Sequence, residues 1–529
     1  MAASESEPFG APDGAAEDPG SFVEFDDIGR WRDLALDDKD RRARILVGRR
    51  GSGKSRYLRK MQVSVQQEGL LDFGQRSEKI SLNNLRWLYK TFSDRAERLE
   101  VWEKLWSCSI YAGVASFLLN ARHRSNTETK LSTADRDFLA QEARSYVPEG
   151  PRELPIVAVL NDIIESYKDR SRLMAYVNDR IWLNIESIIL DAISIATPIF
   201  CFIDALDDNY AQAPAESTDA QLGLIFFILR KVVDPTVQNR LHVVVTVRDV
   251  IYSALLESDN GQRYNNRLHI RCLDWDDRSS SFYLKQKIER LSSQFCIGGK
   301  QCDGPLEKWL GFDTISNSKR NGSMENVEDY IIRHTRFLPR EINEIGNSLS
   351  KEIRAQKSLN RPIDPEKIRR IISSTAQSFA RNMVNEVTLH AAALDQMHDP
   401  KDPLAAQYLK FVTEAVTEFL AQIESEKFSK SQLERARQAF NAVAPWWTPV
   451  FNGRTVLIED VLWQHGLIGY RRAGDPERWV RYFNSAAWAE GDLKATLPDA
   501  AHYYLHSALL DIRTLTTEQA APIAHVNRD

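Results

Sequence analysis

The chain has 529 residues, of which 43% are hydrophobic and 27% are charged, and its formal net charge is −5. This length exceeds what one hydrophobic core supports, so two to four domains are expected. The charge balance excludes a positive field over the whole surface, and any nucleic-acid contact would need a local basic patch. No apolar run approaches the roughly 20 residues that span a bilayer, so no membrane contact is expected.

The first 20 residues contain five acidic side chains and no basic one, which argues against the positively charged start of a signal peptide. Their composition predicts a disordered acidic tail over residues 1–21. The five cysteines form no CxxC pair, and they are typical of reduced, packed thiols in a cytoplasmic protein. A disulfide or a metal between Cys296 and Cys302 is the less favoured alternative.

Hydrophobic patterns then predict elements in chain order. A short apolar run at 43–47 is a strand, and a helix follows from Ser55 to Met61. Leu99, Trp102, Trp106 and Ile110 share one face of a helix. Fully apolar runs predict buried parallel strands. Further predictions are helices at 177–193 and 222–233, and strands at 198–203, 241–247 and 267–272.

The predicted fold class is therefore α/β, with a P-loop NTPase parallel sheet. The predicted domains are a core at 22–275 with a helical insertion at about 80–175, a helical lid at 276–375, a helical connector at 376–445 and a winged-helix-like domain at 446–529. The insertion is inferred because about 150 residues separate Lys54 from Asp204, and connections between strands and helices are usually short.

The segment GRRGSGKS at 48–55 matches the phosphate-binding pattern GxxxxGK[ST] and lies between a predicted strand and a predicted helix. In this pattern, backbone N–H groups at a helix N-terminus cradle phosphates, and the lysine contacts the β- and γ-phosphates. The Ser55 hydroxyl is a candidate Mg²⁺ ligand. The predicted nucleotide-binding residues in this loop and the next helix are Gly48, Gly51, Ser52, Gly53, Lys54, Ser55 and Arg56.

A second carboxylate is expected at the end of a neighbouring strand, where it holds the water shell of Mg²⁺. Asp204 directly follows the apolar run 198–203 and is the candidate. Asp207 and Asp208 follow, and we favour Asp207 as the residue that polarises the attacking water. The alternative is a solvated acidic turn.

Thr246 and Arg248 end the next strand, and parallel strands present their carboxyl ends to a ligand crevice. Arg248 is therefore a candidate sensor of the γ-phosphate and is grouped with the catalytic residues. The alternative is a surface ion pair of Arg248 with Asp249 or with another nearby acidic residue.

The order GRRGSGKS, FCFIDALDD, VVVTVRD and TRFLPRE resembles the STAND/NACHT-like and origin-recognition-like branches of the bacterial AAA+ P-loop ATPases. The resemblance implies the Asp204 and Thr246–Arg248 roles given above. It also implies that Pro339 of a lid element lies near the adenine and that Arg340 touches the phosphates. Phe337 stands where the family's lid element has glycine, and no Glu directly follows Asp204. Slow hydrolysis therefore fits better than fast hydrolysis.

The C-terminal pattern predicts a helix at 456–463, a stop at Gly466 and two strands joined by a turn, 467–472 and 478–483. A helix followed by such a hairpin resembles a winged helix. The arginines of the hairpin could contact the phosphate backbone of DNA. The acidic residues in the turn and in the preceding helix argue against this contact. These arginines are Arg471, Arg472, Arg478 and Arg481.

The leading hypothesis is an ATP- and Mg²⁺-binding switch ATPase that controls self-assembly or docking of a protein partner. By likeness alone, bacterial antiphage defence is the setting inferred for it. The alternative is a DNA-binding ATPase of initiator or regulator type that uses the C-terminal domain. A small-molecule kinase is disfavoured, because the residues after 376 are typical of interaction modules.

Overall fold

The computed structural model describes most of the chain, in the following ranges: residues 7–11, 44–67, 71–73, 79–120, 131–147, 155–193, 198–204, 213–256, 269–273, 275–297, 304–317, 323–394, 404–451, 454–472, 474, 480–483 and 496–510. These residues form two compact units. The sheet unit comprises residues 25–274 with 14–19, and the helical unit comprises residues 275–529 with 1–13 and 20–24.

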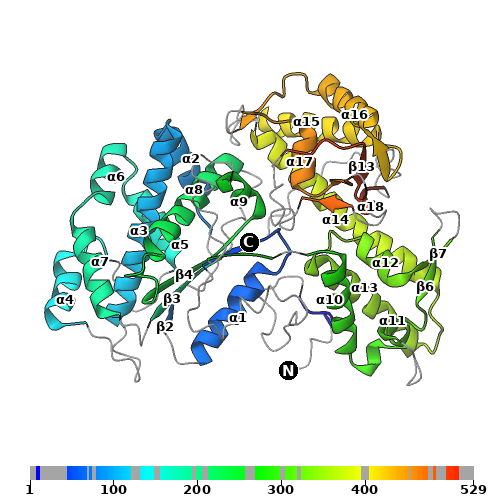
Figure 1. Cartoon of the computed structure of the whole chain (residues 1–529), viewed down its shortest axis with the longest axis horizontal. Helices are drawn as coiled ribbons and strands as arrows, with labels where there is room; N and C mark the ends of the chain where they lie inside the picture. Colours follow the sequence, from blue (N-terminus) through cyan, green and yellow to red (C-terminus); the bar gives the residue numbers. More distant parts are fainter. Residues whose placement is uncertain are drawn as a thin grey trace. The chain divides into compact units, whose positions relative to one another are not determined.

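The sheet unit is built on a five-stranded, all-parallel sheet with the order β2-β3-β4-β1-β5 (Figure 1). The strands are β1 (Ile45–Val47), β2 (Leu71–Phe73), β3 (Ile199–Ile203), β4 (Leu241–Val247) and β5 (Ile270–Cys272). Every residue of β1, β3 and β4 is buried, as expected for parallel strands covered on both faces. The α/β class and the predicted strands at 43–47, 198–203, 241–247 and 267–272 are confirmed, whereas β2 is not predicted.

Helices fill the long stretch between β2 and β3, where an insertion at about 80–175 is predicted. They are α2 (Leu82–Thr91), α3 (Arg95–Asn120), α4 (Thr133–Asp137), a π-helical turn (Phe138–Glu142), α5 (Ile156–Ser166), α6 (Arg170–Val177) and α7 (Ile181–Ala192). The remaining helices of this unit are α1 (Lys54–Gln67), α8 (Pro214–Phe227), which continues into a π-helical turn (Ile228–Val232), and α9 (Asp249–Leu256). The helix predicted at 222–233 therefore begins earlier, with Pro214 in its first turn.

Helices α3 and α8 pack closely through both apolar and charged contacts. Trp102 and Trp106 of α3 are buried, and the indole N–H of Trp106 donates to the carbonyl of Ala220 at 2.8 Å. The carboxylate of Asp219 accepts from Arg98 at 2.9 Å and from Arg95 at 3.2 Å. These ion pairs satisfy a charge that would otherwise be costly to bury.

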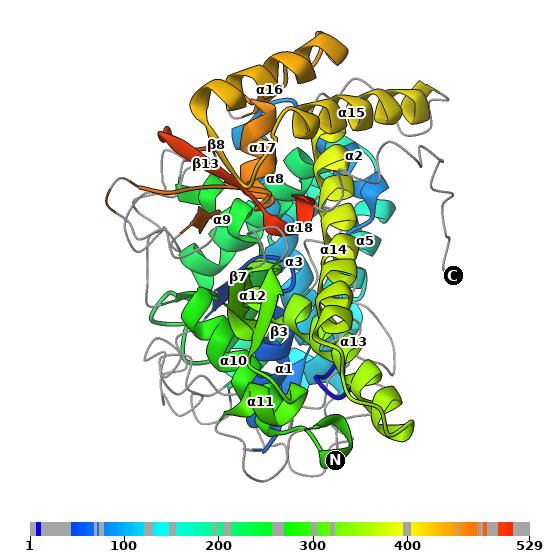
Figure 2. The same ribbon diagram turned by 90° about the vertical axis from the view of Figure 1, so that its right-hand side faces the viewer.

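The helical unit contains a long helix, α14, with α13 alongside it and α15 near its end (Figure 2). Its helices are α10 (Asp277–Glu289), α11 (Pro305–Leu310), α12 (Val327–Arg333), α13 (Pro339–Ser358), α14 (Pro365–Leu394), α15 (Leu404–Ala421), α16 (Lys430–Val443), α17 (Ile458–Gln464) and α18 (Ser507–Leu510). Asp276 and Ser279 form a capping box at the start of α10, and Ser429 and Gln432 form one at α16.

Antiparallel strands complete this unit. A four-stranded sheet has the order β12-β11-β13-β8, and two two-stranded sheets pair β6 with β7 and β9 with β10. The strands are β6 (Thr314–Asn317), β7 (Ser323–Asn326), β8 (Lys427–Ser429), β9 (Val450–Phe451), β10 (Arg454–Thr455), β11 (Ile468–Tyr470), β12 (Arg481–Tyr482) and β13 (His502–Leu505). The predicted pairing of the two C-terminal strands is confirmed, with Gly469 opposite Tyr482. Gly466 ends the preceding helix at φ 70°.

The prediction of a disordered tail over residues 1–21 is wrong for residues 7–11. These residues are part of the helical unit, and the side chain of Phe9 is fully buried there. Composition alone misses this contact, because a single aromatic residue supplies it.

Cys108, Cys201 and Cys296 are buried, and Cys272 is half-buried. Burial raises the pKa of the Cys108 thiol. Cys302, proposed above as the alternative partner of Cys296, lies outside the described residues. In the part of the chain that the structure describes, no helix has the length and apolar character that a membrane crossing requires.

The contact between α3 and α8 generates a stability prediction at Gly223. A Cβ atom there would lie 2.4 Å from the Cβ of Trp102 and 2.9 Å from the backbone N of Glu103. Gly223→Ala should therefore lower the free energy of unfolding by about 1–3 kcal/mol, as overpacking does. Urea unfolding followed by circular dichroism measures the change. A rise of about 1 kcal/mol, which alanine gives in an unobstructed helix, would contradict this packing.

Candidate nucleotide-binding site

The glycine-rich loop connects β1 to α1 at the carboxyl edge of the parallel sheet. It leaves β1 at Gly48, whose backbone N–H donates to the carbonyl of Val247 in β4 at 3.2 Å. Gly51 and Gly53 have φ values of 88° and 93°, a left-handed conformation that strongly favours glycine. Helix α1 then begins at Lys54. The residues that the phosphate-binding pattern requires thus lie between a strand and the N-terminus of a helix, as the sequence predicts.

The glycines of this loop differ in their surroundings. Apart from its two chain neighbours, no residue would have an atom within 4 Å of a Cβ at Gly53. Gly48 is packed instead: a Cβ would lie 2.5 Å from the Oγ of Ser52. The N-terminus of a helix such as α1 attracts anions, because backbone N–H groups point outward there and the helix dipole is positive at this end.

Lys54 folds back over the loop. Its Nζ donates to the carbonyl of Gly48 at 3.0 Å and to that of Arg49 at 3.1 Å, and the side chain is 7% exposed. These bonds hold the ammonium group over the loop. Ser52 and Arg56 are also buried, and Ser55 is half-buried at the first turn of α1.

Asp204 and Thr246 meet at the ends of β3 and β4. The Thr246 hydroxyl donates to Oδ1 of Asp204 at 2.5 Å. The strand register explains this contact, because Ile203 pairs with Val245 and places the next residues side by side. Thr246 in turn pairs with Leu46 of β1, so the carboxylate and the loop share the same edge of the sheet.

Arg248 directly follows β4 and is 7% exposed. The neighbouring Asp249 forms an ion pair with Arg49 of the glycine-rich loop, with 3.4 Å between Nε and Oδ2. This contact between the loop and the start of α9 is not predicted from the sequence. The arginine in GRRGSGKS and the acid that follows β4 are the only signals for it.

The other predicted site residues fall elsewhere. Asp207 and Asp208 lie outside the described residues, so the structure leaves their predicted roles untested. Pro339 and Arg340 begin α13 in the helical unit, with Pro339 in its first turn. Phe337, which replaces the glycine of the lid element, has φ 63° and so adopts a conformation that glycine favours.

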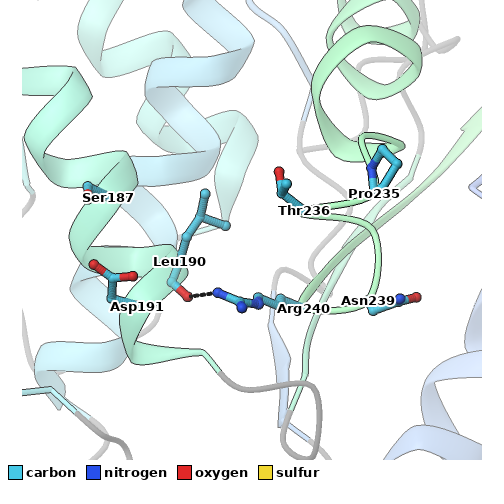
Figure 3. A pocket seen from close by; sticks show the side chains of 7 residues that line it. All are labelled: Ser187, Leu190, Asp191, Pro235, Thr236, Asn239 and Arg240. Atoms are coloured by element: carbon cyan, nitrogen blue, oxygen red, sulfur yellow. Dashed lines mark hydrogen bonds between the residues drawn. The ribbon is translucent and has the colours of Figure 1, made fainter.

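A cavity of about 330 Å³ lies at the opposite edge of the sheet (Figure 3). It is lined by α7 and by the turn that leads into β4, and Arg240 spans it by donating to the carbonyl of Leu190 at 2.9 Å. Ligands of parallel sheets bind at the carboxyl ends of the strands. This cavity is at the amino end of β4, so we assign it no role in the site.

No protein-family model matches the chain, and no curated protein is significantly similar to it.

The contact between Asp204 and Thr246 generates a prediction about Mg²⁺. Asp204→Asn removes a negative charge at this edge and should weaken Mg²⁺-dependent nucleotide binding at least tenfold, since interactions with charged groups contribute ~1.5–3 kcal/mol. Thr246→Val should have a smaller effect, because it removes only the hydroxyl that orients the carboxylate. Titration calorimetry with and without Mg²⁺ measures both. Equal losses with and without Mg²⁺ would contradict a role near the metal.

Proposed function

We propose that this chain binds ATP and Mg²⁺ at the glycine-rich loop and acts as a slowly hydrolysing switch ATPase. The observation that carries the proposal is the loop itself, with Gly51 and Gly53 in left-handed conformations ahead of Lys54 at the first turn of α1. Asp204 follows β3 and accepts a hydrogen bond from Thr246 of β4, the strand next to β1. Its carboxylate is the second polar group that Mg²⁺ binding requires.

Different groups of the protein would bind the phosphates and the Mg²⁺ ion. The loop amides and the start of α1 would bind the phosphates, with Lys54 as the point charge. Ser55 and Asp204 would hold Mg²⁺ and its water shell. The bound nucleotide supplies the anhydride that is hydrolysed. Asp207 and Asp208 remain the proposed positioning groups for water, with Arg248 at the γ-phosphate. Ala205, not Glu, follows Asp204, which supports slow turnover.

The proposed output is control of assembly or of partner docking. It rests on the resemblance to STAND/NACHT-like and origin-recognition-like AAA+ ATPases, as do ATP as the nucleotide and bacterial antiphage defence as the setting. In this proposal Pro339 and Arg340 are the lid residues that respond to nucleotide. The strained φ of Phe337, two residues before α13, supports a special role for this turn, because strain of this kind often marks functional segments.

Lys54→Ala should reduce ATP affinity at least tenfold, because it deletes an interaction with phosphate worth ~1.5–3 kcal/mol. Lys60→Ala is the matched control, since Lys60 lies on the same helix, two turns beyond the loop. Calorimetric titration with ATP and Mg²⁺ measures both variants, and thermal melting checks their folding. Unchanged affinity in a folded Lys54→Ala variant would refute the site.

A DNA-binding regulator is the second candidate, and one observation favours it. Glu459 and Asp460, acidic residues that precede the C-terminal hairpin, are only 2% and 5% exposed. Arg437 pairs with Glu459, and Asp460 accepts from the backbone of Leu457 and Leu497. These acids therefore do not oppose a phosphate backbone at the surface. The four-stranded sheet β12-β11-β13-β8, with α16 and α17 between β8 and β11 in the chain, also supports a winged-helix-like domain.

One pair of measurements separates the two candidates. The switch predicts that ATP increases particle size in light scattering without DNA, and that Lys54→Ala prevents the increase. The regulator predicts binding of duplex DNA that weakens steeply with salt and disappears when Arg471 and Arg481 are changed to Glu. ATP-driven growth with no DNA binding would exclude the regulator, and the reverse pattern would exclude the switch.

A further inference from the structure

The N-terminal residues form a tight turn whose shape is locally encoded. The backbone N–H of Gly10 donates to the carbonyl of Glu7 at 2.9 Å and closes the turn. Pro8 occupies the second position, where its fixed φ suits a turn, and Gly10 occupies the fourth, where glycine is common. Phe9 occupies the third position of this turn.

Phe9 fills a pocket made by two helices of the helical unit. Its side chain is fully buried, and its ring centroid lies 5.0 Å from that of Trp309 in α11. The pocket depends on Gly346 of α13, because a Cβ there would lie 2.3–2.6 Å from ring atoms of Phe9. A bulkier residue at 346 would occupy the space of the ring.

Asn347 binds the backbone of the turn on both sides of the aromatic residue. Its Oδ1 accepts from the N–H of Phe9 at 2.8 Å, and its Nδ2 donates to the carbonyl of Gly10 at 3.0 Å. A side-chain amide that pairs with both a donor and an acceptor of a peptide recognises the backbone. The ring of Phe9 supplies the specificity.

We propose that this surface of α11 and α13 is a peptide-binding site for a Pro-Phe-Gly turn, and that the chain's own residues 7–11 are its exchangeable ligand. The ligand is small: its described contacts include one buried aromatic ring, the buried Pro8 and two hydrogen bonds to the side chain of Asn347. The site does not depend on the proposed nucleotide function.

The test uses the full chain with Phe9→Ala, which empties the pocket. A synthetic peptide of residues 5–13 is added, and saturation-transfer difference NMR detects binding through the peptide protons. Within the peptide, the ring protons of the phenylalanine that corresponds to Phe9 should receive the strongest transfer. The unmodified chain should give a signal at least fivefold weaker, because its own residues 7–11 belong to the same molecule and compete at a high effective concentration.

One chain variant and one altered peptide serve as controls for the pocket. Asn347→Leu, added to Phe9→Ala, should abolish the transfer, and so should a peptide in which the phenylalanine is replaced by alanine. Equal transfer to the emptied and the unmodified chains, or no transfer to a folded Phe9→Ala chain, would overturn the proposal.

Melting temperatures provide an independent test, because Gly346→Ala should change them in opposite directions in two backgrounds. In the unmodified chain, Gly346→Ala should lower the melting temperature by expelling Phe9. In the Phe9→Ala chain the same substitution should raise the melting temperature, because alanine is the better helix residue. The same sign in both backgrounds would show that Gly346 does not serve the peptide site.

Discussion

The parallel pairing of β4 with both β1 and β3 is the constraint on which the candidate site depends. Through this pairing, a register fixed by backbone hydrogen bonds sets Gly48 against Val247 and Asp204 against Thr246. The two members of each pair are far apart in sequence. The loop, the carboxylate and the hydroxyl therefore come to one edge only if the three buried strands form in this order, and the packing of helices around them protects that order.

Much of this edge can be predicted from sequence, because its signals are local and strong. The run 198–203 is wholly apolar, and the run 241–247 has only His242 and Thr246 as polar residues. Both are rich in β-branched or aromatic residues, which leaves little alternative to a buried strand. The loop pattern fixes glycines at the positions that need left-handed conformations. The helix at 181–192 likewise lies within the predicted range 177–193 because its apolar period is regular.

The elements and contacts that the sequence does not predict were missed for physical reasons as well. Strand β2 has only three residues, Leu71–Phe73, and lies at the edge of the sheet, so neither its length nor its pattern distinguishes it from a turn. The β6–β7 hairpin is largely polar. The Arg49–Asp249 ion pair depends on tertiary placement, which no local pattern encodes. The burial of Glu459 and Asp460 likewise cannot be predicted from the sequence, because acidic residues are expected at the surface.

The docked N-terminal turn has a consequence for the order of events during biosynthesis. Phe9 is synthesised before its hydrogen-bonding partner Asn347, which lies 338 residues further along the chain. At ~5–20 residues per second, the turn waits roughly 20–70 s before its pocket is synthesised. Residues 25–274 of the sheet unit are synthesised within that interval. The contact that joins the two ends of this long segment can therefore form only after the sheet unit has been made.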